Sequence, residues 1–194
     1  MRGPRVMQDV IVESVTVASL LLATVYTAWR ARRHNDVEEE PVSDAHGRCY
    51  CGAVQFAVRA TARVIRAAYC HCESCRRAHA APLYHVVYIQ QATQSDPAGF
   101  EITAGAEKIK ECRFKAAPER GSRSFCSECG SKVCNVMSDR RVGFFPATLD
   151  DATQHALPAR FRATLHHCPD EAVVPVFDDG LPWQANRYAA RTTA

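Results

Sequence analysis

The hydrophobic positions after residue 45 fall in short runs that are separated by turns. Little of this part of the chain shows the helical period, and Gly, Pro, Asp and Ser gather between the runs, as at 95–99 and 117–121. The pattern predicts strands at 53–58, 64–69, 82–89, 100–103, 108–114, 132–136 and 142–148. Short strands at this spacing predict a mainly β fold, with helix confined to the N-terminus and to residues 150–155.

The N-terminal segment has a different pattern. Residues 10–29 form an apolar stretch without Gly or Pro that is long enough to span a bilayer, although Glu13 lies within it. The basic run that begins at Arg30 would leave the following domain in the cytosol. The same residues also fit an amphipathic helix, because apolar side chains from Ile11 to Trp29 share one face at helical spacing. A secretory signal would need a cleavage site, and a mitochondrial presequence should lack acidic residues. A membrane anchor and an amphipathic helix therefore stay open as alternatives.

Composition divides the chain into three parts. We predict a hydrophobic helix at 1–34, a solvated linker at 35–44 that contains the acidic run 38–40, and a folded domain at 45–194. The net charge is +3, and the part after residue 40 carries nineteen Lys and Arg against fifteen Asp and Glu. This excess is spread without a Lys or Arg run, so no nucleic-acid partner is indicated, whereas a small anionic ligand is favoured.

The ten cysteines are clustered rather than scattered. Two cysteines that are two or three residues apart would form a strained disulfide, but they can converge on one metal ion. Cys49 and Cys51 would point to the same side of a strand, and Cys126 and Cys129 have the spacing of a zinc knuckle. We therefore expect these four thiolates to form a closed, structural zinc site. Thiolate ligands need a reducing compartment, so we expect a cytoplasmic protein, anchored to a membrane if 10–29 is a span.

A second cluster contains three cysteines, Cys70, Cys72 and Cys75. Three thiolates around zinc leave the fourth position open, as in catalytic zinc sites, and the open position would accept a further thiolate. The basic pair at 76–77 could offset the negative charge or bind a carboxylate. His71 or His79 could instead supply a fourth ligand and close the site, although His71 should point away from its two neighbours on a strand.

The other cysteines and histidines carry little information individually. We expect Cys112, Cys134 and Cys168 to be small buried side chains rather than ligands. Of the histidines, His79 and His85 are the better candidates for a functional role, because they closely follow the three-cysteine cluster.

The cysteine motifs stand in a fixed order along the chain. They read Gly47-x-Cys49-x-Cys51-Gly52, then Cys70-x-Cys72-x-x-Cys75-Arg76, then Phe125-Cys126-x-x-Cys129-Gly130. This set resembles the glutathione-dependent formaldehyde-activating enzyme family, which also includes centromere protein V. The resemblance extends over roughly residues 45 to 182, with further matches at Arg123, at Leu149-Asp150 and at 179–182.

The resemblance implies a β-tent of small coiled antiparallel sheets with two zinc ions. It assigns the structural zinc to Cys49, Cys51, Cys126 and Cys129, and the catalytic zinc to Cys70, Cys72 and Cys75. The implied activity is that of a carbon–sulfur lyase acting on a thiol–aldehyde adduct such as S-hydroxymethylglutathione, with glutathione as the thiol. The alternative is a non-catalytic zinc-binding interaction module, associated with a membrane through residues 10–29. Relatives carry a Gly-containing turn after Cys-Arg, whereas residues 76–82 of this chain contain no glycine.

Overall fold

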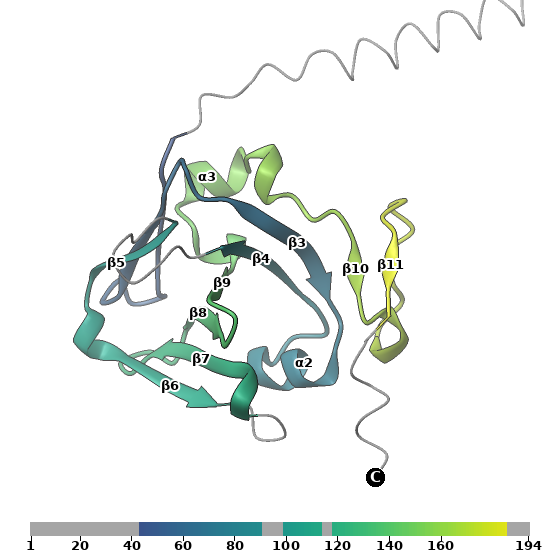
Figure 1. Ribbon diagram of the computed structural model, residues 1–194, viewed down its shortest axis with the longest axis horizontal. Coiled ribbons are helices and arrows are strands. Elements are labelled where there is room, and N and C mark those ends of the chain that lie inside the picture. Colours follow the sequence, from purple (N-terminus) through teal and green to yellow (C-terminus); the bar gives the residue numbers. More distant parts are fainter. Residues whose placement is uncertain (1–42, 91–98, 114–117, 186–194) are drawn as a thin grey trace, which may run out of the picture. The chain divides into compact units, whose positions relative to one another are not determined.

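A computed structural model describes residues 43–90, 99–113 and 118–185 of the protein (Figure 1). The predicted hydrophobic helix and residues 35–42 of the predicted linker lie outside these ranges. Within them, no helix has the length and apolar character needed to cross a membrane.

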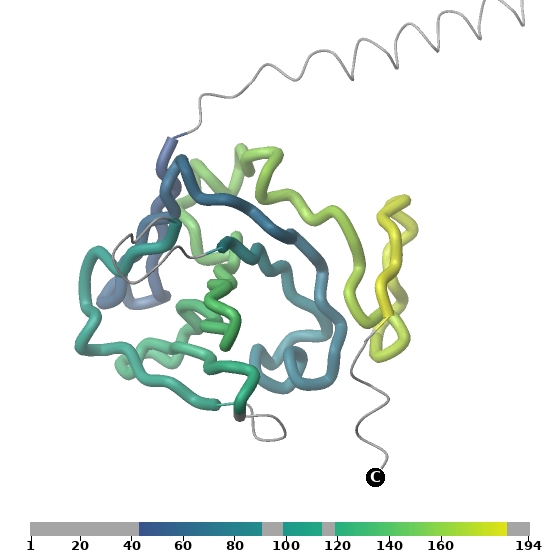
Figure 2. The backbone as a smooth tube through the Cα atoms, viewed as in Figure 1, coloured from purple at the N-terminus to yellow at the C-terminus, as the bar shows by residue number. Residues whose placement is uncertain are grey.

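The described residues form a small sheet and a larger one. In the part of the chain that is described, β1 (Ala45–Arg48), β2 (Gln55–Val58) and β5 (Phe100–Ala104) form a three-stranded antiparallel sheet. The larger sheet has the order β11-β10-β3-β4-β9-β8-β7-β6. Its strands are β3 (Val64–Cys70), β4 (Tyr84–Gln90), β6 (Ile109–Arg113), β7 (Gly121–Cys126), β8 (Lys132–Met137), β9 (Arg141–Phe144), β10 (His166–His167) and β11 (Trp183–Gln184). The larger sheet coils, so that β3 and β4 arch over one side while β6 and β7 lie on the other (Figure 2). The predicted mainly β fold is confirmed.

Short helices connect the strands. The five-residue α3 (Asp151–His155) occupies the segment where helix was predicted, and Asp150 caps it by accepting a hydrogen bond from Thr153 N at 2.8 Å. The helix α2 (Glu73–His79) was not predicted, because its seven residues are too few to show a helical period. Single 3₁₀ turns are η1 (Ala106–Lys108), η2 (Pro118–Arg120), η3 (Pro146–Thr148), η4 (Ala159–Phe161) and η5 (Pro169–Glu171).

The main hydrophobic core lies between the small sheet and the larger one. Phe56 stacks on Phe100 with ring centroids 5.0 Å apart, and Phe144 meets Phe161 edge-on at the same separation. Gly47 allows the two sheets to approach, because a Cβ there would lie 2.2 Å from Cζ of Phe56. The core therefore fixes the start of the domain, including the strand that leads into the first cysteine pair.

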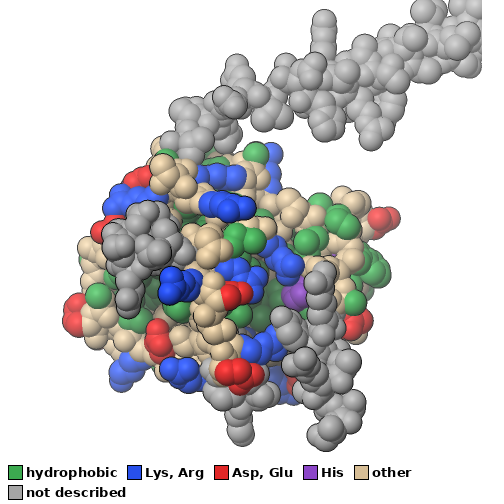
Figure 3. Space-filling model, in the orientation of Figure 1, with side chains coloured by type: hydrophobic (Ala, Val, Ile, Leu, Met, Phe, Trp, Pro, Cys, Tyr) green, Lys and Arg blue, Asp and Glu red, His purple; other side chains and the backbone are tan. Residues whose placement is uncertain are grey.

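The surface agrees with a mildly basic domain. The face seen in Figure 3 carries Lys and Arg side chains near its middle, with hydrophobic side chains between them. Such a face attracts small anions without the continuous basic stripe that nucleic-acid binding needs.

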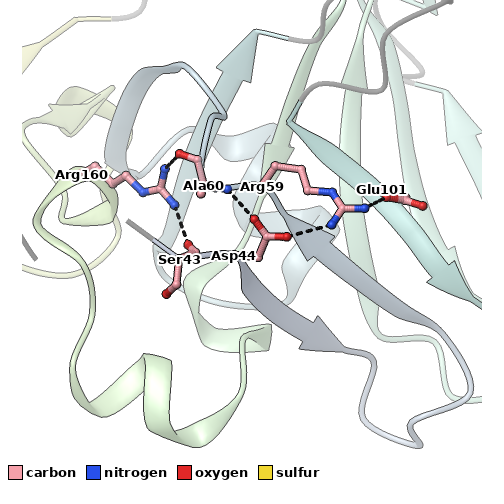
Figure 4. Close-up of polar contacts among 6 residues, drawn as sticks. All are labelled: Ser43, Asp44, Arg59, Ala60, Glu101 and Arg160. Carbon is pink, nitrogen blue, oxygen red and sulfur yellow. Dashed lines mark hydrogen bonds and ion pairs between the residues drawn. The ribbon is translucent and has the colours of Figure 1, made fainter. Parts of the chain in front are cut away.

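An arginine-centred group of polar contacts ties the first strand to its neighbours (Figure 4). Arg59, which follows β2, forms ion pairs with Asp44 at 2.8 Å and with Glu101 on β5. The other oxygen of Asp44 accepts from Ala60 N at 2.7 Å, and the Ala60 carbonyl accepts from Arg160 on η4. These side chains are partly exposed, so the ion pairs contribute little energy individually, but they connect three separate chain segments.

Candidate metal centres

The first cysteine centre is formed by two tight turns that meet. Sγ atoms of the four predicted structural ligands lie within 4.8 Å of one another, a group made of Cys49, Cys51, Cys126 and Cys129. In the first turn Sγ of Cys49 and Cys51 are 3.5 Å apart, and Sγ of Cys51 is 3.9 Å from that of Cys126. The structure therefore brings together, from opposite ends of a long loop, the pairs that the spacing had grouped.

Glycines make these two turns possible. Gly52 and Gly130 have φ values of 76° and 74°, in the left-handed region that favours glycine. Their amides donate to the carbonyls of Cys49 at 3.0 Å and Cys126 at 2.8 Å, which closes each turn around its thiols. The sequence signal for both turns was the glycine that directly follows the second cysteine of each pair.

The surroundings of the first centre favour thiolates. Val54 N donates to Cys49 Sγ at 3.2 Å, and Sγ of Cys129 lies 3.3 Å from Oγ of Ser131. Hydrogen bonding by Ser131 lowers the pKa of Cys129 to about 6. Four soft thiolate donors within tetrahedral reach fit zinc better than a hard cation such as magnesium.

The second cysteine centre lies where a strand passes into a helix. Cys70 is the last residue of β3, Cys72 is the N-cap of α2, and Cys75 lies in the first turn of that helix. Their three Sγ atoms lie within 4.8 Å of one another, and Sγ of Cys70 and Cys72 are 3.5 Å apart. The change from strand to helix explains the mixed spacing, because residues two apart share a face of a strand and residues three apart share a face of a helix.

Hydrogen-bond donors surround this centre. The Tyr84 hydroxyl donates to Cys75 Sγ at 3.2 Å, and burial raises the pKa of Tyr84 well above its usual value, so the phenol keeps its proton. The buried Arg123 on β7 places Nη2 3.8 Å from the same sulfur and 3.1 Å from Oγ of Ser74. A buried guanidinium offsets negative charge that three thiolates would concentrate here.

The basic pair that follows the cluster does not provide this charge. Arg76 Nε donates to the carbonyl of His71 at 2.9 Å, and Arg77 pairs with Glu73 at 2.8 Å on the exposed side of α2. The cation beside the thiols is instead Arg123, which is distant in sequence. Its only sequence signal was its place among the residues of the family resemblance.

Neither candidate histidine completes the second centre. In the ranges that the structure describes, the group of mutually close ligand atoms contains three thiols and no histidine nitrogen. His71 is fully buried, and its Nε2 shares a hydrogen bond of 2.9 Å with Nδ1 of His166. Nε2 of His166 lies 3.2 Å from both carboxylate oxygens of Asp179. This chain of three side chains ties the C-terminal strands to the cysteine loop and holds His71 away from the thiols.

Cys168 lies beside the second centre, where sequence reasoning had placed a plain buried side chain. Parallel pairing of β10 with β3 sets His167 opposite Cys70, so that the next residue reaches the cysteine loop. Cys168 is 1% exposed, and hydrogen bonds from Cys168 and Cys70 lower the pKa of Cys72. The contact with Cys72, together with burial, raises the pKa of Cys168, which therefore keeps its proton.

The other two cysteines differ from each other. Cys134 is buried in the main core as expected, and burial raises its pKa to about 11. Cys112 is exposed on β6, so the expectation of a buried side chain was wrong there. It lies on a strand whose side chains are mostly exposed, and a lone cysteine gives no signal that separates an edge from a core position.

The fold and the two centres define a mainly β protein with two candidate metal sites, one of four thiols and one of three. A model of the glutathione-dependent formaldehyde-activating enzyme family matches residues 44–163, which is more than half of the 194-residue chain. The chain belongs to this family. It is also similar to a crystal structure of a Rhodobacter sphaeroides protein, with 21% sequence identity, a TM-score of 0.42, and coverage of 72% of this chain and 99% of that chain.

Proposed function

We propose that the protein is a zinc enzyme that makes or splits the carbon–sulfur bond of a thiol–aldehyde adduct such as S-hydroxymethylglutathione. The observation that carries this proposal is the three-thiol centre, in which donors surround the sulfurs but no fourth ligand atom of the described residues joins the group. A purely structural site would be expected to hold four protein ligands, as the first centre does.

Both donor sets fit zinc. Cys49, Cys51, Cys126 and Cys129 would hold the structural ion, and Cys70, Cys72 and Cys75 would hold the catalytic ion. Bound zinc would supply a Lewis acid with a position for a substrate sulfur or oxygen. The residues of this chain do the remaining work, since Tyr84 and Arg123 hold Cys75 in place and balance the charge of the thiolates.

The reaction is an addition that needs little covalent help from the protein. When the adduct forms, the sulfur–carbon bond is made, the carbon–oxygen π bond is broken, and the proton lost by the thiol is the one gained by the oxygen. Holding the two reactants together supplies much of the rate, because positioning removes the entropy cost of their encounter. The basic residues on the face in Figure 3 suit a thiol that carries carboxylates, as glutathione does.

Compartment and domain limits follow from the same proposal. Seven thiolate ligands require reducing conditions, so the enzyme works in the cytoplasm. The catalytic domain spans 45–194, after a linker at 35–44.

The adduct also forms spontaneously, so the test measures exchange above the uncatalysed rate. Exchange between glutathione with formaldehyde and S-hydroxymethylglutathione is followed by NMR, with and without enzyme. We expect acceleration by the wild type, loss of acceleration with Cys72→Ala, and no change with Cys112→Ala, which alters an exposed cysteine outside both centres. No acceleration by the wild type at full zinc loading would refute the proposed activity.

A further inference from the structure

His79 is the histidine that the structure places beside the three-thiol centre. It lies four residues after Cys75 on α2, so the two side chains project from the same face of the helix. Its ring stacks on Tyr84 with centroids 4.1 Å apart and an interplanar angle of 13°, and it meets Phe145 edge-on at 4.9 Å. Because the hydroxyl of Tyr84 donates to Cys75, one side chain separates this imidazole from a proposed zinc ligand.

The Nε2 atom of His79 has no hydrogen-bond partner among the described residues, although the atom is buried. Leaving a buried polar atom unsatisfied costs about 1–3 kcal/mol, so such an atom in a native protein calls for a physical reason. The two rings that clamp the imidazole fix its orientation, and rotation toward another protein partner would lose the stack. A ligand that enters beside the thiols could supply the partner.

The ring is neutral under physiological conditions. Burial, with further contributions from Arg123 and Lys132, lowers the pKa of His79 to about 4, against an opposing effect of Cys72. A neutral imidazole nitrogen either donates or accepts one hydrogen bond, according to its tautomer. This versatility suits an oxygen that is a carbonyl before the addition and a hydroxyl after it.

We propose that His79 is a catalytic residue whose Nε2 forms a hydrogen bond with the aldehyde-derived oxygen of the substrate. The proposal rests on the proposed function and adds the residue that recognises the one-carbon end of the adduct. In the addition His79 holds the oxygen as the π bond opens, and in the reverse reaction it holds the hydroxyl whose proton returns to sulfur. The sulfur end of the same molecule is left to the three-thiol centre.

His85 provides a matched control within the same strand and loop region. It is a second histidine whose Nε2 is buried and unpartnered among the described residues, and burial lowers its pKa to about 4 as well. It follows Tyr84 on β4, so it points to the opposite face of the strand, where its ring lies 5.1 Å from that of Tyr69. Replacement of His85 should therefore not affect the chemistry.

The first test exchanges His79 for Phe, which keeps an aromatic ring for the stack and removes the nitrogen. We expect about a 10²-fold loss in the catalysed exchange rate, as for removal of one oxygen-stabilising donor, with zinc content unchanged. The midpoint of thermal unfolding should not fall, because the lost nitrogen has no protein partner to leave behind. His79→Gln, whose amide can still reach the oxygen, should recover part of the rate, and His85→Phe should keep all of it. Wild-type rates for His79→Phe would overturn the proposal.

The second test measures the contact without turnover. The ¹⁵N shift of His79 Nε2 is recorded in zinc-loaded protein with S-hydroxymethylglutathione and with S-methylglutathione, which lacks the hydroxyl. We expect a shift with the first compound only, and equal responses to both would overturn the proposal. A selective shift in a protein that shows no catalysis would retain His79 as a binding residue while the proposed activity fails. An active enzyme without the selective shift would remove His79 alone.

Discussion

The end of helix α2 contains an energetic flaw that a single substitution should repair. Ala80, its C-cap, has φ 49° and ψ 40° and donates its N–H to the carbonyl of Arg76. An L-residue pays about 1–2 kcal/mol for this left-handed conformation, whereas glycine does not. Glycine in turn loses about 0.5–1 kcal/mol through the greater freedom of the unfolded chain. The difference predicts that Ala80→Gly stabilises the domain by about 0.5–1 kcal/mol.

Thermal and urea unfolding of fully zinc-loaded protein would measure this effect. For a domain of this size the gain corresponds to a rise in Tm of about 1–4 °C. Ala78→Gly is the matched control, because Ala78 lies inside the same helix, where glycine should destabilise by about 0.5–1 kcal/mol. If Ala80→Gly destabilised the protein as Ala78→Gly does, the left-handed cap would be wrong, and with it the position of His79 at the helix end.

Three further substitutions test the core and the three-thiol centre. Gly47→Ala should destabilise the domain by about 1–3 kcal/mol, seen in urea unfolding, because the new Cβ would clash with Phe56. Tyr84→Phe removes the hydroxyl that donates to Cys75, so zinc affinity of that centre should fall about 10-fold in a chelator competition. Cys168→Ala should leave two zinc ions per chain by elemental analysis while it weakens the three-thiol centre by a similar factor of about 10.

Each of these expectations has a distinct contrary result. Wild-type stability of Gly47→Ala would mean that the two sheets do not approach as closely as described. Unchanged zinc affinity of Tyr84→Phe would mean that the phenol does not support the Cys75 thiolate. Loss of one whole zinc from Cys168→Ala would make Cys168 a fourth ligand and the second centre a closed one.

The cysteine centres were predictable because their information is local. The short spacings and the glycines that follow each pair of the first centre are visible in sequence, and so is the strand-rich pattern that confirmed a mainly β fold. The strand β7 was missed because it presents buried Ser122, Arg123 and Ser124 rather than apolar residues. Their burial is explained by contacts that the sequence does not show, such as that of Arg123 with Cys75.

The surroundings of the three-thiol centre depend on long-range pairing. Cys168 reaches Cys72 only because the two-residue strand β10 pairs with β3, and a strand of that length has no sequence signature. The stack of His79 on Tyr84 likewise requires the chain to turn between α2 and β4. Spacing thus identified the thiols, whereas the residues that tune them came from the fold.

The coordination of each bound zinc tests the account most directly. Elemental analysis of protein purified under reducing conditions, combined with X-ray absorption at the zinc edge, gives the number of ions and their sulfur ligands. The account predicts two zinc ions per chain, one with four sulfur ligands and one with three sulfurs and a lighter atom, with the second ion lost in folded Cys72→Ala. A single zinc ion, or two ions that each have four sulfur ligands, would contradict it.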